Sequence, residues 1–154
     1  MKINDFSKWK LFSIWYKATK IRTTTKIIDP FYIAKEYNID VSFIDMDEPY
    51  AFNQYNPLSR RYTIYISNAV DKYSAKILCA HELGHIFCEK PQAVNLFDHK
   101  IDPVSEFTAN CFASFLVPFD ARFTLKDDTT IEDYNDFVAS LILKKQQALR
   151  ETTV

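Results

Sequence analysis

The sequence predicts an α+β fold that is mainly helical, with a small antiparallel sheet packed beside one central helix. Most of the chain consists of segments with helical periodicity that begin at capping residues, which indicates several helices. Two short segments rich in β-branched and aromatic residues alternate with period two, as strands do. The central helix is expected at residues 71–90, after Asp71 or Ser74, and it carries an H-E-x-x-H motif. No repeat or linker divides the 154 residues, so we expect one domain over 1–154.

The composition is that of an ordered globular protein without a strong overall charge. Hydrophobic residues make up 47% of the chain and charged residues 25%, a balance that excludes an intrinsically disordered protein. The formal net charge of −1 argues against binding of nucleic acid through the overall charge. We therefore expect no direct nucleic-acid partner.

The sequence contains no pattern typical of a targeting or membrane segment. No stretch approaches the roughly 20 apolar residues of a membrane span, and the N-terminus carries charges in place of a signal-peptide core. No C-x-x-C pair occurs among the three cysteines, Cys79, Cys88 and Cys111. We expect a cytoplasmic protein with reduced thiols and no membrane partner.

The N-terminal segment, residues 1–28, combines basic and aromatic side chains. Within residues 6–28 there is no acid, and the aromatic residues Trp9, Phe12, Trp15 and Tyr16 alternate with Lys8, Lys10, Lys17, Lys20, Arg22 and Lys26. The simpler interpretation is a first helix whose apolar side docks on the domain while its lysines stay in water. The alternative is a surface that stacks on bases or binds an acidic partner.

A short helix followed by strands is predicted next. Asp29-Pro30 pairs an N-cap with a proline at the first helical position, so a helix is expected from there to about Asn38. Residues 41–44 and 61–66 alternate as strands do, and between them lie the turn-forming residues Asn53, Asn56 and Pro57. We expect two or three strands in one antiparallel sheet.

The C-terminal part of the chain predicts two more helices. Asp102-Pro103 begins a largely apolar helix that ends before Pro118, and we expect this helix to be the buried partner of the central one. The pattern Thr130-x-x-Asp133 is close to a capping box and opens a last amphipathic helix. Residues 148–154 are expected to fray.

The H-E-x-x-H motif predicts half of a metal site. His81 and His85 lie one turn apart on the same face of the central helix, with about 6 Å between their Cβ atoms, which suits a shared cation. Glu82 flanks that face, so its carboxylate can act on a metal-bound water without binding the metal. Gly84, the single glycine of the chain, lies within the motif. A mid-helix glycine costs about 1 kcal/mol relative to alanine, so we expect a strand or a substrate to pass close to the backbone there.

A catalytic zinc needs a third protein ligand, for which Glu106 is the best candidate. It lies 21 residues after His85, near the start of a buried helix, where a carboxylate needs a cation or metal as partner. Asn110 follows one turn later, where its amide can orient a histidine ligand. The competing ligands are His99, Cys88 and Glu89.

These residues together resemble a known family. The sequence His81-Glu-Leu-Gly-His85, followed by Glu106-Phe-Thr-Ala-Asn110-Cys-Phe-Ala113 and Leu116-Val-Pro118, is similar to the ImmA/IrrE family of zinc metallo-endopeptidases. The resemblance covers residues about 60–120. H-E-x-x-H alone is moderately specific, whereas the combination with E-x-x-A-N-x-F-A is strong.

The resemblance implies a zincin-like metallopeptidase domain with one Zn²⁺. His81, His85 and Glu106 would bind the metal and Glu82 would be the general base. Family members often cleave or inactivate a helix-turn-helix repressor of a prophage or mobile element, which implies a DNA-binding repressor as the protein substrate. Many relatives have a further histidine where this chain has Glu89, a difference that bears on the charge at the edge of the site.

Some functional questions stay open at the level of sequence. The donor that stabilises the oxyanion could be Tyr62, Tyr65, His99 or Tyr134. The motif could also be a helix with two half-exposed histidines, or hold zinc only for stability. A second function is a binding module, an anti-repressor that captures a regulatory protein without cutting it, and a weaker one is a nucleic-acid-binding regulator.

Overall fold

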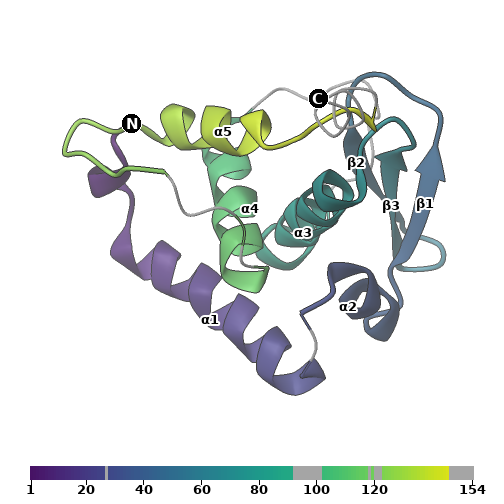
Figure 1. The fold of residues 1–154 in the computed structure, drawn as a ribbon. Coiled ribbons are helices and arrows are strands. Elements are labelled where there is room, and N and C mark those ends of the chain that lie inside the picture. Colours follow the sequence, from purple (N-terminus) through teal and green to yellow (C-terminus); the bar gives the residue numbers. More distant parts are fainter. Residues whose placement is uncertain (27, 92–101, 118, 120–122, 146–154) are drawn as a thin grey trace.

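The computed structural model describes residues 1–26, 28–91, 102–117, 119 and 123–145, and it has the predicted α+β architecture (Figure 1). Its helices are a short 3-10 helix η1 (Ile3–Asp5), α1 (Lys8–Thr25), α2 (Pro30–Glu36), α3 (Lys72–Cys88), α4 (Pro103–Leu116) and α5 (Ile131–Ser140). The strands in these residues are β1 (Asp40–Ile44), β2 (Ala51–Asn56) and β3 (Arg61–Ser67), which form one sheet. In Figure 1, α4 lies among α1, α3 and α5, and the sheet lies beyond α3.

The predicted capping residues begin the helices as expected. Asp29, Asp71 and Asp102 each accept a hydrogen bond from a backbone N–H in the first turn of α2, α3 and α4. Thr130 completes a capping box at the start of α5. Each such cap contributes about 1 kcal/mol to helix stability. Asp71 rather than Ser74 is the cap of α3, since Ser74 is buried inside the helix.

The sheet is mixed, so the prediction of an antiparallel sheet is wrong for one of its strand pairs. β3 lies between the other two strands; β2 pairs with it antiparallel, and β1 pairs with it parallel. The connection over residues 45–50 causes this arrangement, because it takes the chain past the end of β3 to its other side. There the Ser67 hydroxyl donates a hydrogen bond to the Met46 carbonyl at 2.5 Å.

β2 occupies a stretch that the sequence predicted to contain a turn. Asn53 lies inside this strand, opposite Ile64 of β3, whereas the turn begins at Asn56, whose side chain accepts a hydrogen bond from the Leu58 N–H. Asparagine is depleted in strands, but pairing with β3 over the whole length of β2 overrides that preference. Paired residues face the same side of a sheet, so Asn53 faces α3 together with the fully buried Ile64.

α3 and α4 touch at Gly84, and this contact explains the glycine. A Cβ atom at this position would lie 2.8 Å from both the Cα and the carbonyl oxygen of Ala109, and 3.1 Å from the Cβ of Phe112. The segment that passes close to the glycine is therefore α4, and the expectation of a strand or a substrate there was wrong. The contact brings the first turn of α4 beside the motif of α3.

α1 packs against the opposite side of α4 from the motif helix and the strands (Figure 1). Its buried residues are Ile14, Ala18 and Ile21, which agrees with the predicted docked helix. Its aromatic side chains instead remain on the surface, with exposed fractions from 43% to 82%: Trp9, Phe12, Trp15 and Tyr16. Among the helices that the structure describes, none has the length and apolar composition needed to cross a membrane.

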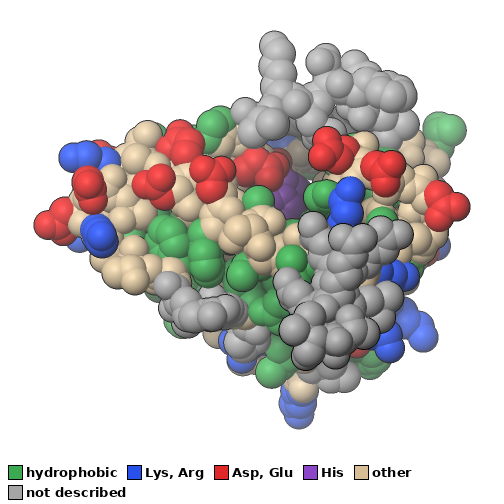
Figure 2. Space-filling model, turned by 45° about the horizontal axis from the view of Figure 1, so that its top comes forward, with side chains coloured by type: hydrophobic (Ala, Val, Ile, Leu, Met, Phe, Trp, Pro, Cys, Tyr) green, Lys and Arg blue, Asp and Glu red, His purple; other side chains and the backbone are tan. Residues whose placement is uncertain are grey.

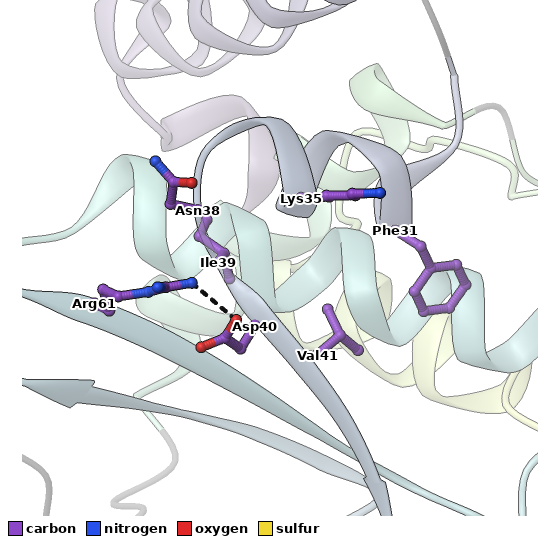
Figure 3. Close-up of a pocket in the computed structure, with 7 residues that line it drawn as sticks. All are labelled: Phe31, Lys35, Asn38, Ile39, Asp40, Val41 and Arg61. Atoms are coloured by element: carbon purple, nitrogen blue, oxygen red, sulfur yellow. Dashed lines mark hydrogen bonds and ion pairs between the residues drawn. The ribbon is translucent and has the colours of Figure 1, made fainter.

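A pocket of about 300 Å³ lies at α2 and the adjoining strand β1 (Figure 3). An ion pair of 2.9 Å between Arg61 and Asp40 crosses one side of it. The remaining lining residues are Phe31, Lys35, Asn38, Ile39 and Val41. None of the predicted site residues lines this pocket, so the predicted chemistry belongs to another part of the molecule.

Candidate metal centre

The three predicted ligands lie together where α3 meets α4. His81 and His85 project from successive turns of α3, and Glu106 lies in the first turn of α4. The Nε2 atoms of the two histidines are 3.1 Å apart, and they lie 3.2 and 3.1 Å from the two carboxylate oxygens of Glu106. One ligand atom from each residue falls within 4.8 Å of the others. This donor set, two imidazoles and one carboxylate, fits a single metal ion.

The charges of these groups depend on their contacts. Burial raises the pKa of Glu106, but hydrogen bonds and attraction from both histidines outweigh it and hold that pKa well below its usual range. Burial lowers the pKa of His85, whereas its contacts with Glu106 and Glu89 raise it to about 10 in the metal-free protein. A metal ion must therefore displace a proton from His85, because only neutral imidazole binds a metal.

A chain of amide side chains orients His81. Its Nδ1 lies 2.7 Å from the side-chain oxygen of Asn110. The amide of Asn110 cannot turn over, because its nitrogen donates to the side-chain oxygen of Asn135 on α5 at 2.8 Å. Asn135 in turn donates to the carbonyl of Pro103 at 3.1 Å. Nδ1 of His81 must then carry the proton, which leaves Nε2 free to bind a metal.

Glu82 lies beside the ligands but is held by the sheet. Its side chain is buried, with 5% exposed, and its Oε2 accepts a hydrogen bond of 2.6 Å from the side-chain nitrogen of Asn53 on β2. A buried carboxylate needs such a donor. The contact fixes one oxygen of Glu82 and leaves the carboxylate next to the metal ligands, outside the group that would bind the ion.

The competing ligands lie outside the group, or outside the described residues in the case of His99. The carboxylate of Glu89 lies 3.1 Å from Nδ1 of His85, on the edge of the imidazole ring away from Nε2. The thiol of Cys88 lies near that of Cys111 and contributes to the raised pKa of Cys111. Burial raises the pKa of Cys88 itself to about 11. A thiol of this kind is a poor source of thiolate at neutral pH.

Figure 2 shows where the centre reaches the surface. A histidine side chain is visible at the bottom of a hollow, and acidic side chains lie on both sides of it. The two ligand histidines are 13% and 15% exposed, so a small part of each remains accessible. The centre is therefore open to solvent on this face.

A family model decides the relationship of this chain to known proteins. The model of the IrrE N-terminal-like domain, Peptidase_M78, matches residues 34–147. The chain belongs to the ImmA/IrrE family. No curated protein and no solved structure matched it.

The family match extends the resemblance seen in the motifs. It begins in α2 and includes the sheet, both helices of the metal centre and α5, while α1 lies outside it. ImmA/IrrE proteins are metal-dependent peptidases, and the fold of this chain is the zincin-like α+β fold expected from the sequence. The chain thus has the family, fold and grouped metal ligands of a metallopeptidase.

Two of the predicted oxyanion donors lie on different faces of β3. Tyr62 is on the face turned toward α3, as Ile64 is, and burial together with the charges of Tyr55 and Glu89 raises its pKa. Tyr65 lies on the other face, where its ring stacks on Phe52 at 4.8 Å. The structure therefore brings Tyr62 to the side of the metal centre and keeps Tyr65 away from it.

Of the other two donors the structure describes only Tyr134, and it does not bring this residue to the centre. The hydroxyl of Tyr134 interacts with Ser114, two turns beyond Glu106 along α4, while burial raises its pKa. That separation corresponds to roughly 12 Å of helix rise. His99 lies outside the described residues.

Three polar residues of the centre were missed by sequence reasoning: Asn53, Ser105 and Asn135. Asn53 resembled a turn residue, and its role depends on the register of β2, which no local pattern reveals. Asn135 comes from α5, 25 residues after Asn110. Ser105 precedes Glu106, and this neighbour of a predicted ligand is the one of the three that the sequence could have suggested.

Proposed function

We propose that this protein is a zinc-dependent endopeptidase. The carrying observation is that the Nε2 atoms of His81 and His85 lie 3.1 Å apart, and each lies 3.1 to 3.2 Å from a different oxygen of the Glu106 carboxylate, next to the buried carboxylate of Glu82. Neighbouring ligands on a tetrahedral zinc with bonds of 2.0–2.1 Å are about 3.3–3.4 Å apart. The two histidine nitrogens are close to that separation, and one ligand atom from each of the three residues falls within 4.8 Å of the others, so this donor set suits a single zinc ion.

Glu82 is the proposed general base and acid. A zinc ion held by His81, His85 and Glu106 would supply Lewis acidity, which would polarise a peptide carbonyl and acidify a water molecule. Glu82 takes a proton from the attacking water and gives it to the nitrogen of the leaving amine, so that the C–N bond breaks as a carboxylate and an amine form. Asn53 holds Oε2 of Glu82, which leaves Oε1 for proton transfer.

β2 provides a place for an extended peptide. In the described part of the chain this strand pairs only with β3, so its other edge is available, and Asn53 places it beside Glu82. A peptide that adds to this edge gains backbone hydrogen bonds in the manner of β-augmentation. Its backbone would then run along α3, past the metal centre. Tyr62, on the same side of the sheet, is the preferred oxyanion donor among the predicted residues.

A DNA-binding repressor of a prophage or mobile element is the proposed substrate. The family resemblance motivates this choice, and the charge of the site face supports it. α5, which contacts the centre through Asn135, exposes three acids on its surface, Glu132, Asp133 and Asp136. Such a face repels nucleic acid and attracts the basic surface that DNA-binding proteins carry. We propose a cytoplasmic location, where such a repressor acts.

The decisive experiment compares the wild type and Glu82→Gln with a purified helix-turn-helix repressor as the substrate. The wild type should bind one zinc ion and cut the repressor into defined fragments. The variant should keep its zinc and cut at least about 10²–10⁴-fold more slowly, because a general base contributes that much. The exposed Glu36→Gln serves as the control and should behave as the wild type. A purified wild type without stoichiometric zinc would refute the proposal.

The alternative is an anti-repressor that binds its target without cutting it. The exposed aromatic side chains of α1, which lies outside the family match, favour this possibility because they offer a docking surface. In that case Glu82→Gln would still release the repressor from DNA, and no fragment would form with either protein.

A further inference from the structure

The two ligand histidines differ in what holds their outer nitrogens. Nδ1 of His81 lies against a neutral amide, the side-chain oxygen of Asn110, at 2.7 Å. Nδ1 of His85 lies against a carboxylate, Oε1 of Glu89, at 3.1 Å. Both acceptors require a protonated Nδ1 and so leave Nε2 for a metal. Only the second acceptor carries a charge.

Glu89 is itself fixed from α4. The hydroxyl of Ser105 donates a hydrogen bond to Oε1 of Glu89, and it also lies 3.4 Å from Nδ1 of His85. Ser105 stands in the first turn of α4, next to the ligand Glu106. The side chain of Glu89 is 30% exposed, so this contact is partly shielded from water. The carboxylate therefore has a defined position on the outer edge of the His85 ring.

The location of Glu89 is unfavourable unless it has such a partner. It is the residue that ends α3, where the partial negative charge of the helix C-terminus repels a carboxylate. Its oxygen also lies on the wrong edge of the ring for a metal ligand, since the metal-facing atoms are both Nε2. Neither helix stability nor direct ligation explains this carboxylate, whereas a contact with His85 does.

We propose that Glu89, held by Ser105, is a positioning residue that orients His85 and compensates the charge of the metal centre. A divalent ion with two neutral imidazoles and one carboxylate has a net charge of about +1. Glu89 neutralises that charge through the imidazole ring and increases the basicity of His85, as carboxylates beside ligand histidines do. Asn110 fixes His81 without this contribution, so the two histidines are unequal ligands.

This inference rests on the proposed zinc centre and is tested by metal affinity, without any substrate. Zinc binding to the full chain is measured at pH 7.5 by competition with a chromogenic chelator. Glu89→Ala should weaken the affinity by about 10–100-fold, the range found for such outer partners. Glu89→Gln keeps an acceptor and loses the charge, so its affinity should lie between those of Glu89→Ala and the wild type.

Two further variants keep the test decisive if Glu89→Ala folds poorly. Ser105→Ala should weaken zinc binding by a smaller factor, and adding it to Glu89→Ala should cause no further loss, since Ser105 acts through Glu89. Asp136→Asn, at an exposed acid on α5, is the control for a general loss of negative charge and should bind zinc as the wild type does. Thermal unfolding of the metal-free variants separates a loss of affinity from a loss of stability.

A second readout reports the ligand set itself. The visible spectrum of the Co²⁺-substituted protein should keep its tetrahedral intensity in Glu89→Ala and shift in band position, because His85 stays a ligand but becomes less basic. A loss of tetrahedral intensity would identify Glu89 as a ligand and overturn the inference. Affinity within twofold of the wild type in Glu89→Ala would overturn it as well. Absence of zinc binding in the wild type would refute the proposed function instead.

Discussion

α4 has two very different contacts with its neighbouring helices. Toward α3 it meets the backbone of Gly84 with no space for a methyl group, and polar residues at the end of this contact form the candidate metal centre. Toward α1 the contact is formed mainly by apolar residues such as Ile14 and Ala18, with one hydrogen bond from Arg22 to the Phe115 carbonyl. The first contact lies within the family match, and the whole of α1 lies before it.

The two contacts of α4 have different roles: the contact with α1 contributes to stability, and the contact with α3 also positions the candidate metal ligands. The apolar contact with α1 stabilises the fold through burial, which depends on area and volume and tolerates some change in shape. The contact with α3 fixes the distance between the two helices that carry the candidate ligands of one metal ion. Substitutions in the contact with α1 should therefore lower only the stability of the fold. Substitutions in the contact with α3 should lower both stability and metal affinity.

The largest loss of stability is expected from Ile14→Ala. The side chain is 4% exposed, and replacing a buried isoleucine by alanine costs about 2–5 kcal/mol. Urea unfolding measures this loss. Zinc affinity of the folded variant should equal that of the wild type, and a weaker affinity would show that the two contacts are not independent. Trp9→Ala on the same helix is the control; its side chain is 82% exposed, so the change should stay within about 0.5 kcal/mol.

Gly84→Ala should have a smaller effect on stability but a clear effect on the metal. The new methyl group meets backbone atoms of Ala109 at 2.8 Å, so α3 and α4 must move apart. Overpacking of this kind costs about 1–3 kcal/mol, of which the better helix propensity of alanine offsets up to about 1 kcal/mol. Zinc affinity should fall as the distance from the histidines to Glu106 increases. Unchanged affinity would contradict this, and Lys76→Ala, exposed on the same helix, is the control.

The smallest predicted effect is a pH dependence confined to the metal-free protein. Because the pKa of His85 is raised to about 10 in the folded state, its charged form stabilises the fold fully below the unfolded value of 6.5. That contribution is lost as the pH rises through the folded pKa. Urea unfolding of the chelator-treated protein between pH 6 and 10 should show the loss. His85→Gln and the zinc-bound protein should lack it, while Ile14→Ala should retain it.

Parts of the fold that depend on local chemistry were predictable from the sequence. Capping by Asp29, Asp102 and Thr130 set the starts of three helices, because a cap acts on backbone groups within its own first turn. The direction of β1 was not predictable. Local alternation indicates which residues form a strand. The connection around the end of β3 decides whether β1 pairs with β3 in a parallel or an antiparallel direction.

The candidate site was likewise only partly predictable from the sequence. The spacing of His81 and His85 follows from helical geometry, and the cost of burying Glu106 near a helix start suggested it as their partner. The structure brings these three residues together. Asn53 and Asn135 reach the centre from elements far away in sequence, and their roles depend on tertiary packing that no spacing rule contains.

The contact between Gly84 and Ala109 also bears on which ions the centre can select. The backbones of α3 and α4 already touch, so the helices cannot approach further around a smaller ion. His81 and His85 are held at their outer nitrogens, which restricts rotation of both rings. Glu106, with 36% of its side chain exposed, is the ligand that retains conformational freedom. We therefore expect discrimination among cations by ionic radius to depend on the rotamers of a single carboxylate.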